Sequence, residues 1–310
     1  MALNIDFAFE GFRVIRARPQ LIPIWGLVLL VFYAGFFYMM ATMMGPVFAD
    51  LQNLSAGAGA ATNPAAVMGI YQRILPMYGI LIPGGLVFGA VMNCAVYRAV
   101  LEPANSAFGY LRLGGDELRM IGVNLLFMLV FIAAEFAIGI GFGIVLGVSA
   151  VAAPKAAGFV GVILGLVVFG LVIWLWTRIS LFTVQTFATK KINLFGSWSL
   201  TRGHFWTLFG GYIVVLVLAI IVEILFMIIF GVATGLTSAF VHVAPVAPAA
   251  TSNPFNAFAT VFANPVLLVV MALFIVLLAP LMITIMIAPA AAAYRALTGH
   301  GLTREAEKVF

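Results

Sequence analysis

Six long runs of apolar residues constrain this chain more than any other feature of its sequence. The longest run, residues 119–151, would measure about 50 Å as one α-helix, whereas a bilayer crossing needs only about 20 residues. Charged residues make up 8% of the chain and hydrophobic residues 65%, against roughly 25% and 45–50% in a water-soluble domain. This number of charged residues is too small for a water-soluble surface. The sequence therefore predicts an all-α polytopic membrane protein with six transmembrane helices.

The predicted spans follow one another along the chain, and we expect one integral membrane domain over residues 1–310. They cover residues 21–44, 77–100, 119–151, 158–177, 206–236 and 265–293. We expect Pro83 to interrupt the second span, and Pro280 and Pro289 to break the sixth. Residues 178–205 are predicted to be the longest internal loop. Residues 1–20 predict an amphipathic interfacial helix, and two acids before the first apolar run argue against a signal peptide there.

The basic residues favour one side of the membrane. With six spans both termini lie on the same side, and thirteen of the 15 Lys and Arg residues then share it. Only Arg73 and Lys155 fall on the other side. Cytoplasmic loops carry an excess of Lys and Arg, so both termini are predicted to be cytoplasmic. The same distribution accounts for the net charge of +5, so we expect no nucleic acid partner.

Matched residues indicate that the spans form repeated pairs. At an offset of 88 residues Glu135 matches Glu223, and at an offset of 197 the Tyr-Arg-Ala sequence of residues 97–99 recurs at residues 294–296. Arg178 ends the fourth span in the same role. We therefore predict three related hairpins, each with a short interfacial helix, two spans and a closing arginine. They cover about residues 5–98, 106–178 and 194–295. As parallel repeats they are related by a pseudo-threefold axis or by duplication without symmetry.

A motif near the middle of the chain resembles a known family. Residues 195–198 read Phe-Gly-Ser-Trp, residues 200–203 read Leu-Thr-Arg-Gly, residues 205–206 read Phe-Trp and residues 208–210 read Leu-Phe-Gly. With the six-span pattern, this motif resembles an uncharacterised bacterial inner-membrane family that includes the membrane domain of some glycerophosphodiester phosphodiesterases. The resemblance implies a location in the bacterial cytoplasmic (inner) membrane. The soluble phosphodiesterase barrel of the fused members is absent from this sequence, so no catalytic role carries over.

Glu135 and Glu223 are candidate site residues because each lies within an apolar span. A carboxylate near the middle of a bilayer costs roughly 2.5–3.5 kcal/mol on insertion scales. The two acids therefore predict an intramembrane polar site for protons, cations or a polar headgroup. In the alternative interpretation, each acid is neutral or hydrogen-bonded to a neighbouring helix and only stabilises the bundle.

Cationic and aromatic side chains gather on the predicted inner surface. They are Lys190, Lys191, Trp198, Arg202 and Trp206. Such residues anchor a protein at the membrane interface, and in a second interpretation they contact anionic lipid headgroups. Glycines at a four-residue spacing, such as those at 139, 143 and 147, allow close helix approach. They predict packing within the chain, self-association or binding to other membrane proteins.

No catalytic constellation is visible in the sequence. The histidines share no ligand spacing with Cys94 or an acid, so we expect no metal, no cofactor and no enzymatic activity. The sequence predicts a non-enzymatic integral membrane protein with a role in membrane or lipid homeostasis, through binding of membrane lipids or partner membrane proteins. The alternative is a small transporter or lipid-moving protein that uses Glu135 and Glu223, and an intramembrane enzyme is a third.

Overall fold

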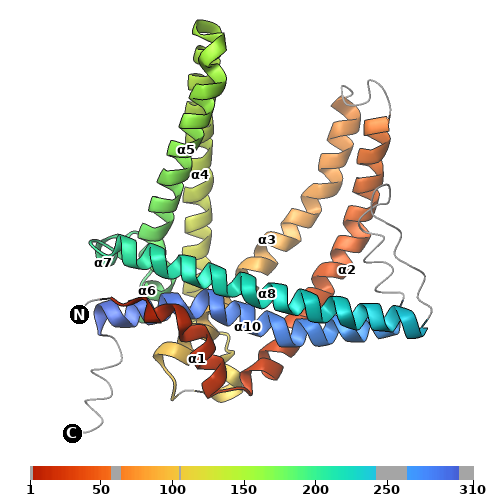
Figure 1. Cartoon of the computed structure of the whole chain (residues 1–310), viewed down its shortest axis with the longest axis vertical. Coiled ribbons are helices and arrows are strands. Elements are labelled where there is room, and N and C mark those ends of the chain that lie inside the picture. The colour runs from red at the N-terminus through yellow and green to blue at the C-terminus, as the bar shows by residue number, and fades with distance from the viewer. Residues whose placement is uncertain (1–2, 57–63, 105, 242–263, 300–310) are drawn as a thin grey trace. The chain divides into compact units, whose positions relative to one another are not determined.

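Helices make up nearly all of the residues that the structure describes. The computed structural model describes residues 3–56, 64–104, 106–241 and 264–299, and within them it has no β-strand. Six helices are long (Figure 1): α2 (Leu21–Ala56), α3 (Pro64–Leu101), α4 (Gly115–Ala152), α5 (Pro154–Ile179), α8 (Phe205–Val241) and α10 (Pro265–Thr298). The short ones are η1 (Ile5–Phe9), α1 (Glu10–Ala17), η3 (Ala107–Tyr110), α6 (Phe182–Thr189) and α7 (Gly196–Leu200). The all-α prediction is confirmed for this part of the chain.

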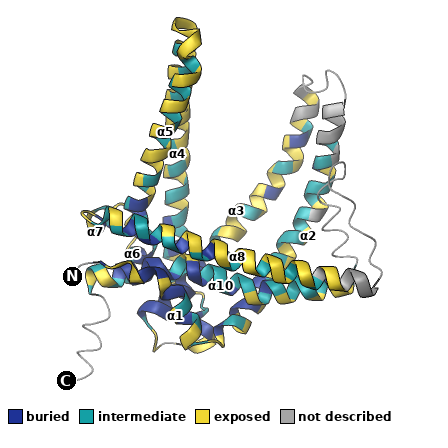
Figure 2. Cartoon of the chain, in the orientation of Figure 1, coloured by how far each residue is buried: buried dark blue, intermediate teal, exposed yellow. Residues whose placement is uncertain are grey.

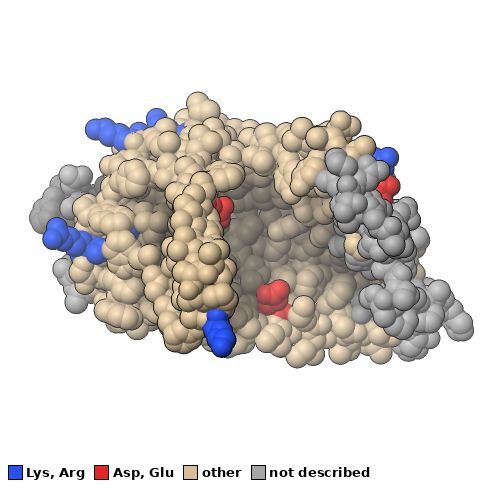
Figure 3. Space-filling model, turned by 90° about the horizontal axis from the view of Figure 1, so that it is seen from above, with Lys and Arg blue, Asp and Glu red and all other residues tan. Residues whose placement is uncertain are grey.

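The six long helices correspond one to one with the six predicted spans. Each is long and apolar enough to cross a membrane. Much of their apolar surface is exposed along their length, as Figure 2 shows in yellow. Charged side chains are sparse on the face seen in Figure 3. A surface of this kind needs an apolar solvent to cover it.

Local sequence explains where several helices begin. α4 begins after Gly114 and carries Asp116 and Glu117 in its first turn, where acids stabilise the helix dipole. α5 begins at Pro154, a residue that suits the first helical position because it lacks an N–H. Before α10, the side chain of Asn264 accepts hydrogen bonds from the first backbone N–H groups of the helix.

The predicted breaks at prolines are wrong. α3 continues through Pro83, and α10 continues through Pro280 and Pro289. A proline removes one helical hydrogen bond, but a long apolar helix tolerates this loss where other groups satisfy the freed backbone. The prolines therefore lie inside the spans without ending them.

The predicted loop at residues 178–205 is largely helical, which is a second correction. It holds α6 and α7, and the side chains of Leu181, Val184 and Phe187 are buried. Their three-residue spacing gives a short helix one apolar face, a signal that is easily missed in an eight-residue element. α6 contacts both α4 and α7, so this segment is packed against the ends of the long helices rather than extended into solvent.

The described residues form two compact units. Unit 1 comprises residues 3–10, 86–104, 106–215 and 287–299, and unit 2 comprises residues 11–56, 64–85, 216–241 and 264–286. Thus α3, α8 and α10 each contribute to both. The prediction of one membrane domain over the whole chain stays a prediction.

In unit 1, α4 and α5 form a hairpin of two adjacent helices (Figure 1). The first part of α4 packs against α6, and its side chains Met120 and Val123 are buried. The rest of α4 pairs with α5, which has 26 residues and so measures about 39 Å. That length exceeds the ~30 Å hydrocarbon core of a bilayer. The first residues of the predicted third span therefore pack beside α6 rather than beside α5.

In unit 2, α2 and α10 approach each other at a glycine. A Cβ atom added at Gly26 would overlap the backbone carbonyl of Val276. Pro280 cannot donate to that carbonyl, because proline has no N–H, so its usual helical partner is missing. The small residue on α2 thus lies where α10 has lost a backbone hydrogen bond. Phe274 of α10 also packs against Phe226 and Phe230 of α8.

Candidate functional site

A buried ion pair joins the end of α3 to the beginning of α4. The guanidinium of Arg98 donates to Glu117 Oε1 at 2.5 Å and to the carbonyl of Tyr110 at 3.1 Å. The two charged side chains are only 5% and 3% exposed. The ring of Phe187 on α6 lies 5.7 Å from the Arg98 guanidinium carbon. Taking two charges out of water is costly unless they pair, so this geometry ties α3, α4 and α6 to one arrangement.

Further charges surround this pair. Asp116 accepts hydrogen bonds from Lys190 and from Arg119, both at 2.8 Å. Lys190 also lies 4.2 Å from the centre of the Phe187 ring and 4.0 Å from Glu102. A cavity of about 350 Å³ opens beside these groups and is lined by charged residues and glycines. We call the set Arg98, Glu102, Asp116, Glu117, Arg119 and Lys190 the charged cluster.

The charged cluster is suited to holding helices together. Its three acids are matched by three cations, so opposite charges compensate one another within it. No three histidine, cysteine or acidic side chains of the described residues come together in a way that could hold a metal ion. Glu117 Oε2 is buried without a hydrogen-bond partner, a position that a water molecule can satisfy.

A second arginine of unit 1 pairs with an acid near the chain's beginning. Arg295, in the last turn of α10, donates to Glu10 Oε1 at 2.9 Å and to the carbonyl of Val100 at 3.1 Å. The Glu10 side chain is 9% exposed and that of Arg295 39%. Arg98 and Arg295 therefore make the same two kinds of contact, one with a carboxylate and one with a backbone carbonyl.

The third arginine of this kind, Arg178 in the last turn of α5, has no such acid. Its guanidinium carbon lies 5.8 Å from the ring centre of Trp174 and 5.7 Å from that of Trp198. Its Nε and Nη1 atoms are buried without a hydrogen-bond partner among the described residues. The carbonyl of Arg178 accepts hydrogen bonds from Ser197 and Thr201, which fix α7 beside the end of α5.

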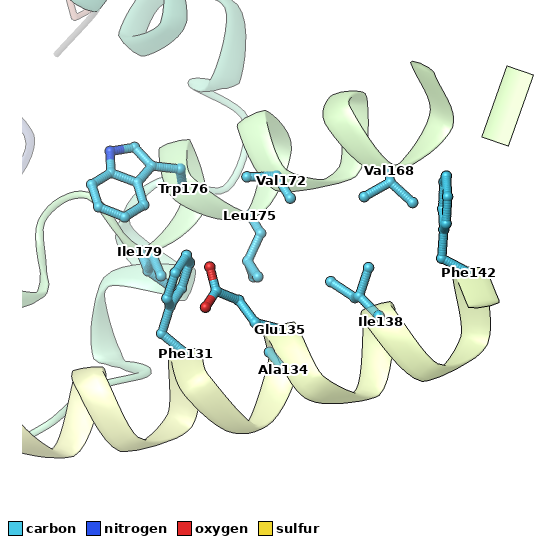
Figure 4. A pocket seen from close by; sticks show the side chains of 11 residues that line it. Phe131, Ala134, Glu135, Ile138, Phe142, Val168, Val172, Leu175, Trp176 and Ile179 are labelled. Atoms are coloured by element: carbon cyan, nitrogen blue, oxygen red, sulfur yellow. The ribbon is translucent and has the colours of Figure 1, made fainter. Parts of the chain in front are cut away.

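Glu135 lines a pocket between α4 and α5 (Figure 4). The pocket has a volume of about 380 Å³. Its lining comprises Phe131, Ala134, Glu135, Ile138, Gly139, Phe142, Val168, Val172, Leu175, Trp176 and Ile179. The figure shows the carboxylate of Glu135 turned toward the space between the two helices, beside Phe131 and Leu175. Glu135 thus lies next to the last turns of α5 rather than at the middle of the hairpin.

The two candidate acids lie in different compact units. Glu135 belongs to unit 1 and Glu223, on α8, to unit 2. Both residues are exposed, and neither has a hydrogen bond or ion pair with any described residue. The predicted hydrogen-bond donor for each acid is therefore not found within the described part of the chain. Whether the two acids share a cavity stays a prediction.

The predicted inner-surface residues have different surroundings. Lys190 belongs to the charged cluster, and Trp198 packs against Trp174 and Arg178. The others, Lys191, Arg202 and Trp206, are exposed, with Trp206 at 78%. The exposed three remain candidates for lipid contact. The glycines at 139, 143 and 147 have open space where a Cβ would lie, so they make no close helix contact within the described residues.

Sequence reasoning did not predict the charged cluster. Glu117 falls between two predicted spans, yet it is only 2% exposed. The available signal was an arginine in the last turn of one long helix followed by acids in the first turn of the next. Such an arrangement brings opposite charges together when the helices are neighbours.

The six apolar helices and their exposed apolar surface define a multi-pass membrane protein. No protein-family model, curated protein or solved structure matches this chain.

Proposed function

We propose that this chain is a non-enzymatic integral membrane protein that binds membrane lipids and acts in membrane or lipid homeostasis. The observation that carries the proposal is the pocket between α4 and α5. Its volume of about 380 Å³ falls within the ~300–1,000 Å³ of typical ligand sites. The hairpin around it exposes apolar side chains along its length, so a lipid acyl chain can enter without leaving an apolar environment.

One polar group in this pocket would determine the orientation of a bound lipid. Glu135 supplies the carboxyl group of an otherwise apolar or aromatic lining, and it has no described partner. In an apolar solvent, a polar group without a partner gains from a ligand that hydrogen-bonds to it. A lipid would therefore bind with a polar atom, such as an ester or hydroxyl oxygen, at Glu135 and with an acyl chain extending toward Phe142.

Filling the pocket tests the proposal. Gly139 lines the pocket and has open space at its Cβ position, so Gly139→Leu places an apolar side chain in the cavity. Gly141, two residues along α4, also has open space but does not line the pocket, which makes Gly141→Leu the matched control. We expect a phospholipid with a photoreactive acyl chain to crosslink to Val172 and Leu175 in the parent and in Gly141→Leu. Crosslinking should fall severalfold in Gly139→Leu, and equal crosslinking in all three would refute lipid binding there.

The proposed location is the bacterial inner membrane with both termini in the cytoplasm. Three features support it: the resemblance of residues 195–210 to an inner-membrane family, the uneven distribution of Lys and Arg, and the even number of candidate spans. Arg98, Arg178 and Arg295 all lie in last turns of helices that would return to the cytoplasmic side. Short helices before α2, α4 and α8 would lie along that surface.

The three-hairpin arrangement is part of the proposal. With the hairpins at about residues 5–98, 106–178 and 194–295, each closing arginine contacts the beginning of the next hairpin. Arg98 contacts Glu117 of the second, Arg178 contacts Trp198 of the third, and Arg295 contacts Glu10 of the first. This cyclic order supports a pseudo-threefold relation between the hairpins.

Transport that depends on Glu135 and Glu223 is the second candidate function. It is favoured by the lack of a described partner for either carboxyl group, because an unpaired intramembrane acid often marks an ion or proton path. Glutamine keeps the shape of glutamate but cannot ionise. Transport predicts that Glu135→Gln and Glu223→Gln abolish proton movement in proteoliposomes containing a pH-sensitive dye. Unchanged proton movement in the double variant would end this candidate.

A further inference from the structure

Arg178 differs from the two other arginines that end a long helix in unit 1. Arg98 and Arg295 each bind a carboxylate and a backbone carbonyl. Arg178 binds neither in the described part of the chain, and two of its three guanidinium nitrogens are buried and unpaired. A guanidinium stays charged at any physiological pH. Its buried N–H groups therefore need an acceptor from outside the described residues.

The proposed repeats show which acid is missing. The spacing that relates Phe9 to Phe195 is 186 residues, and it relates Glu10, the partner of Arg295, to Gly196. The 88-residue offset relates Glu117, the partner of Arg98, to Phe205. Neither position holds an acid in the third hairpin. A side chain at Gly196 would also collide with Asn193 and Gln185, each within 2.6 Å of its Cβ position.

Aromatic rings determine how a ligand can reach Arg178. Trp174 and Trp198 lie within 5.8 Å and 5.7 Å of the guanidinium carbon, and the two rings meet edge to face at 5.2 Å. Because the two ring centres are about as close to each other as to the guanidinium carbon, both rings lie on one side of it. The side chain as a whole is only partly buried, and Nη2 is not among its buried unpaired nitrogens, so a small anion can approach the guanidinium through Nη2.

The surroundings favour phosphate on a lipid. Lys191 and Arg202, on either side of α7, are exposed and have no ion pair among the described residues, which gives this region a positive charge. Trp174 is 39% exposed, and tryptophan at the end of an apolar helix typically lies at the level of lipid headgroups. Arginine binds phosphate oxygens through two parallel hydrogen bonds.

We propose that Arg178, beside Trp174 and Trp198, binds a phosphate anion, supplied by the headgroup of an anionic phospholipid. This inference rests on the proposed lipid-binding function and names the headgroup class. The site lies on a different face of α5 from the Glu135 pocket, because residues 174 and 178 are one turn apart while the pocket is lined by residues 172, 175, 176 and 179. The two sites can therefore be tested separately.

Tryptophan quenching provides the test in the full-length protein. In a background carrying Trp176→Phe and Trp206→Phe, the remaining tryptophans are Trp174, Trp198 and the buried Trp25. Nanodiscs of phosphatidylcholine receive a small fraction of brominated phosphatidylglycerol or of brominated phosphatidylcholine. We expect stronger quenching by the brominated phosphatidylglycerol. The affinity for phosphatidylglycerol should exceed that for phosphatidylcholine about fivefold, which is the effect of about one cationic side chain at the membrane surface.

Three variants decide the outcome. Arg178→Gln should abolish the preference for phosphatidylglycerol, and Arg178→Lys should retain part of it because lysine keeps the charge without paired hydrogen bonds. Lys155→Gln removes one charge at the other end of α5 and should leave the preference intact. Monodisperse elution of each variant shows that it is folded. Equal quenching by both lipids in the parent, or a preference that persists in Arg178→Gln, overturns the lipid site.

A second arm separates the two sources of phosphate. Inorganic phosphate is added to the parent and to Arg178→Gln in neutral detergent, and the melting temperature is measured. Stabilisation of the parent alone, without any preference for phosphatidylglycerol, assigns the site to free phosphate. No stabilisation together with no lipid preference refutes the anion site altogether. Crosslinking at the α4–α5 pocket does not depend on Arg178, so it reports separately on the proposed function.

Discussion

At the scale of single residues, two ion pairs with similar distances differ in how far their side chains are buried. Arg98 and Glu117 are 5% and 3% exposed, whereas Arg73 and Asp50 pair at 2.8 Å with 56% and 38% of their side chains exposed. An exposed pair contributes about 0–1 kcal/mol because water competes for both charges. Removing one partner of a buried pair leaves an uncompensated charge, which costs about 3–5 kcal/mol.

We therefore expect Glu117→Ala to lower the free energy of unfolding by about 3–5 kcal/mol, and Arg73→Ala to change it by less than about 1 kcal/mol. Unfolding by sodium dodecyl sulfate in mixed micelles measures both. The double variant Arg98→Ala with Glu117→Ala should cost less than the two single changes added together, because it leaves no unpaired charge. An additive double variant would show that the two side chains do not act as a pair.

At the scale of elements, glycine matters only where two backbones meet. On α2, Gly26 lies against the backbone of Val276 on α10, while Gly35 has open space at its Cβ position. Without a hydrophobic effect between helices in lipid, close backbone approach is a main source of helix association. The glycines that look most repetitive in the sequence, at 139, 143 and 147, have open space instead.

Gly26→Ala should separate α2 from α10 and lower stability by about 1–3 kcal/mol, the usual cost of overpacking. Gly35→Ala on the same helix should be neutral or stabilising by up to about 1 kcal/mol, because alanine favours a helix more than glycine does. Thermal unfolding of both variants in detergent, followed by size-exclusion chromatography, measures the difference. Equal melting temperatures would show that this contact does not support the pair of helices.

At the scale of the whole molecule, the topology follows from the number of spans and the distribution of charge. Lys155 lies in the first turn of α5, close to the end of α4, whereas Arg119 and Arg178 lie near the opposite ends of these two helices. If all six candidate spans cross the membrane, the chain returns to the side on which it began.

Reporter fusions test the topology. A fusion after Lys155 should report the periplasm, as should fusions after Ala58 and Pro248, which lie outside the described residues. A fusion after Phe310, also outside them, should report the cytoplasm. Alkaline phosphatase is active only in the first location and green fluorescent protein only in the second. Phosphatase activity at Phe310 would contradict six spans with cytoplasmic termini.

Much of the architecture could be predicted from the sequence because apolar length is a local property. Runs of this length cannot be soluble, and α-helices satisfy every backbone hydrogen bond within the run. The six spans follow from this. Glu135 could be singled out for the same reason, since an acid within such a run is rare whatever surrounds it.

Contacts between distant residues were decided only by the tertiary structure. Composition does not tell whether Glu117 faces water or Arg98, because that depends on which helix ends meet. Likewise, nothing local distinguishes Gly26 from Gly35, or Arg178 from Arg295, until neighbouring helices are in place. The sequence by itself determined six apolar helices, because each run needs its own backbone hydrogen bonds in lipid. The tertiary structure decided which charges are paired and which one is left without an acid, because pairing depends on distances between helices.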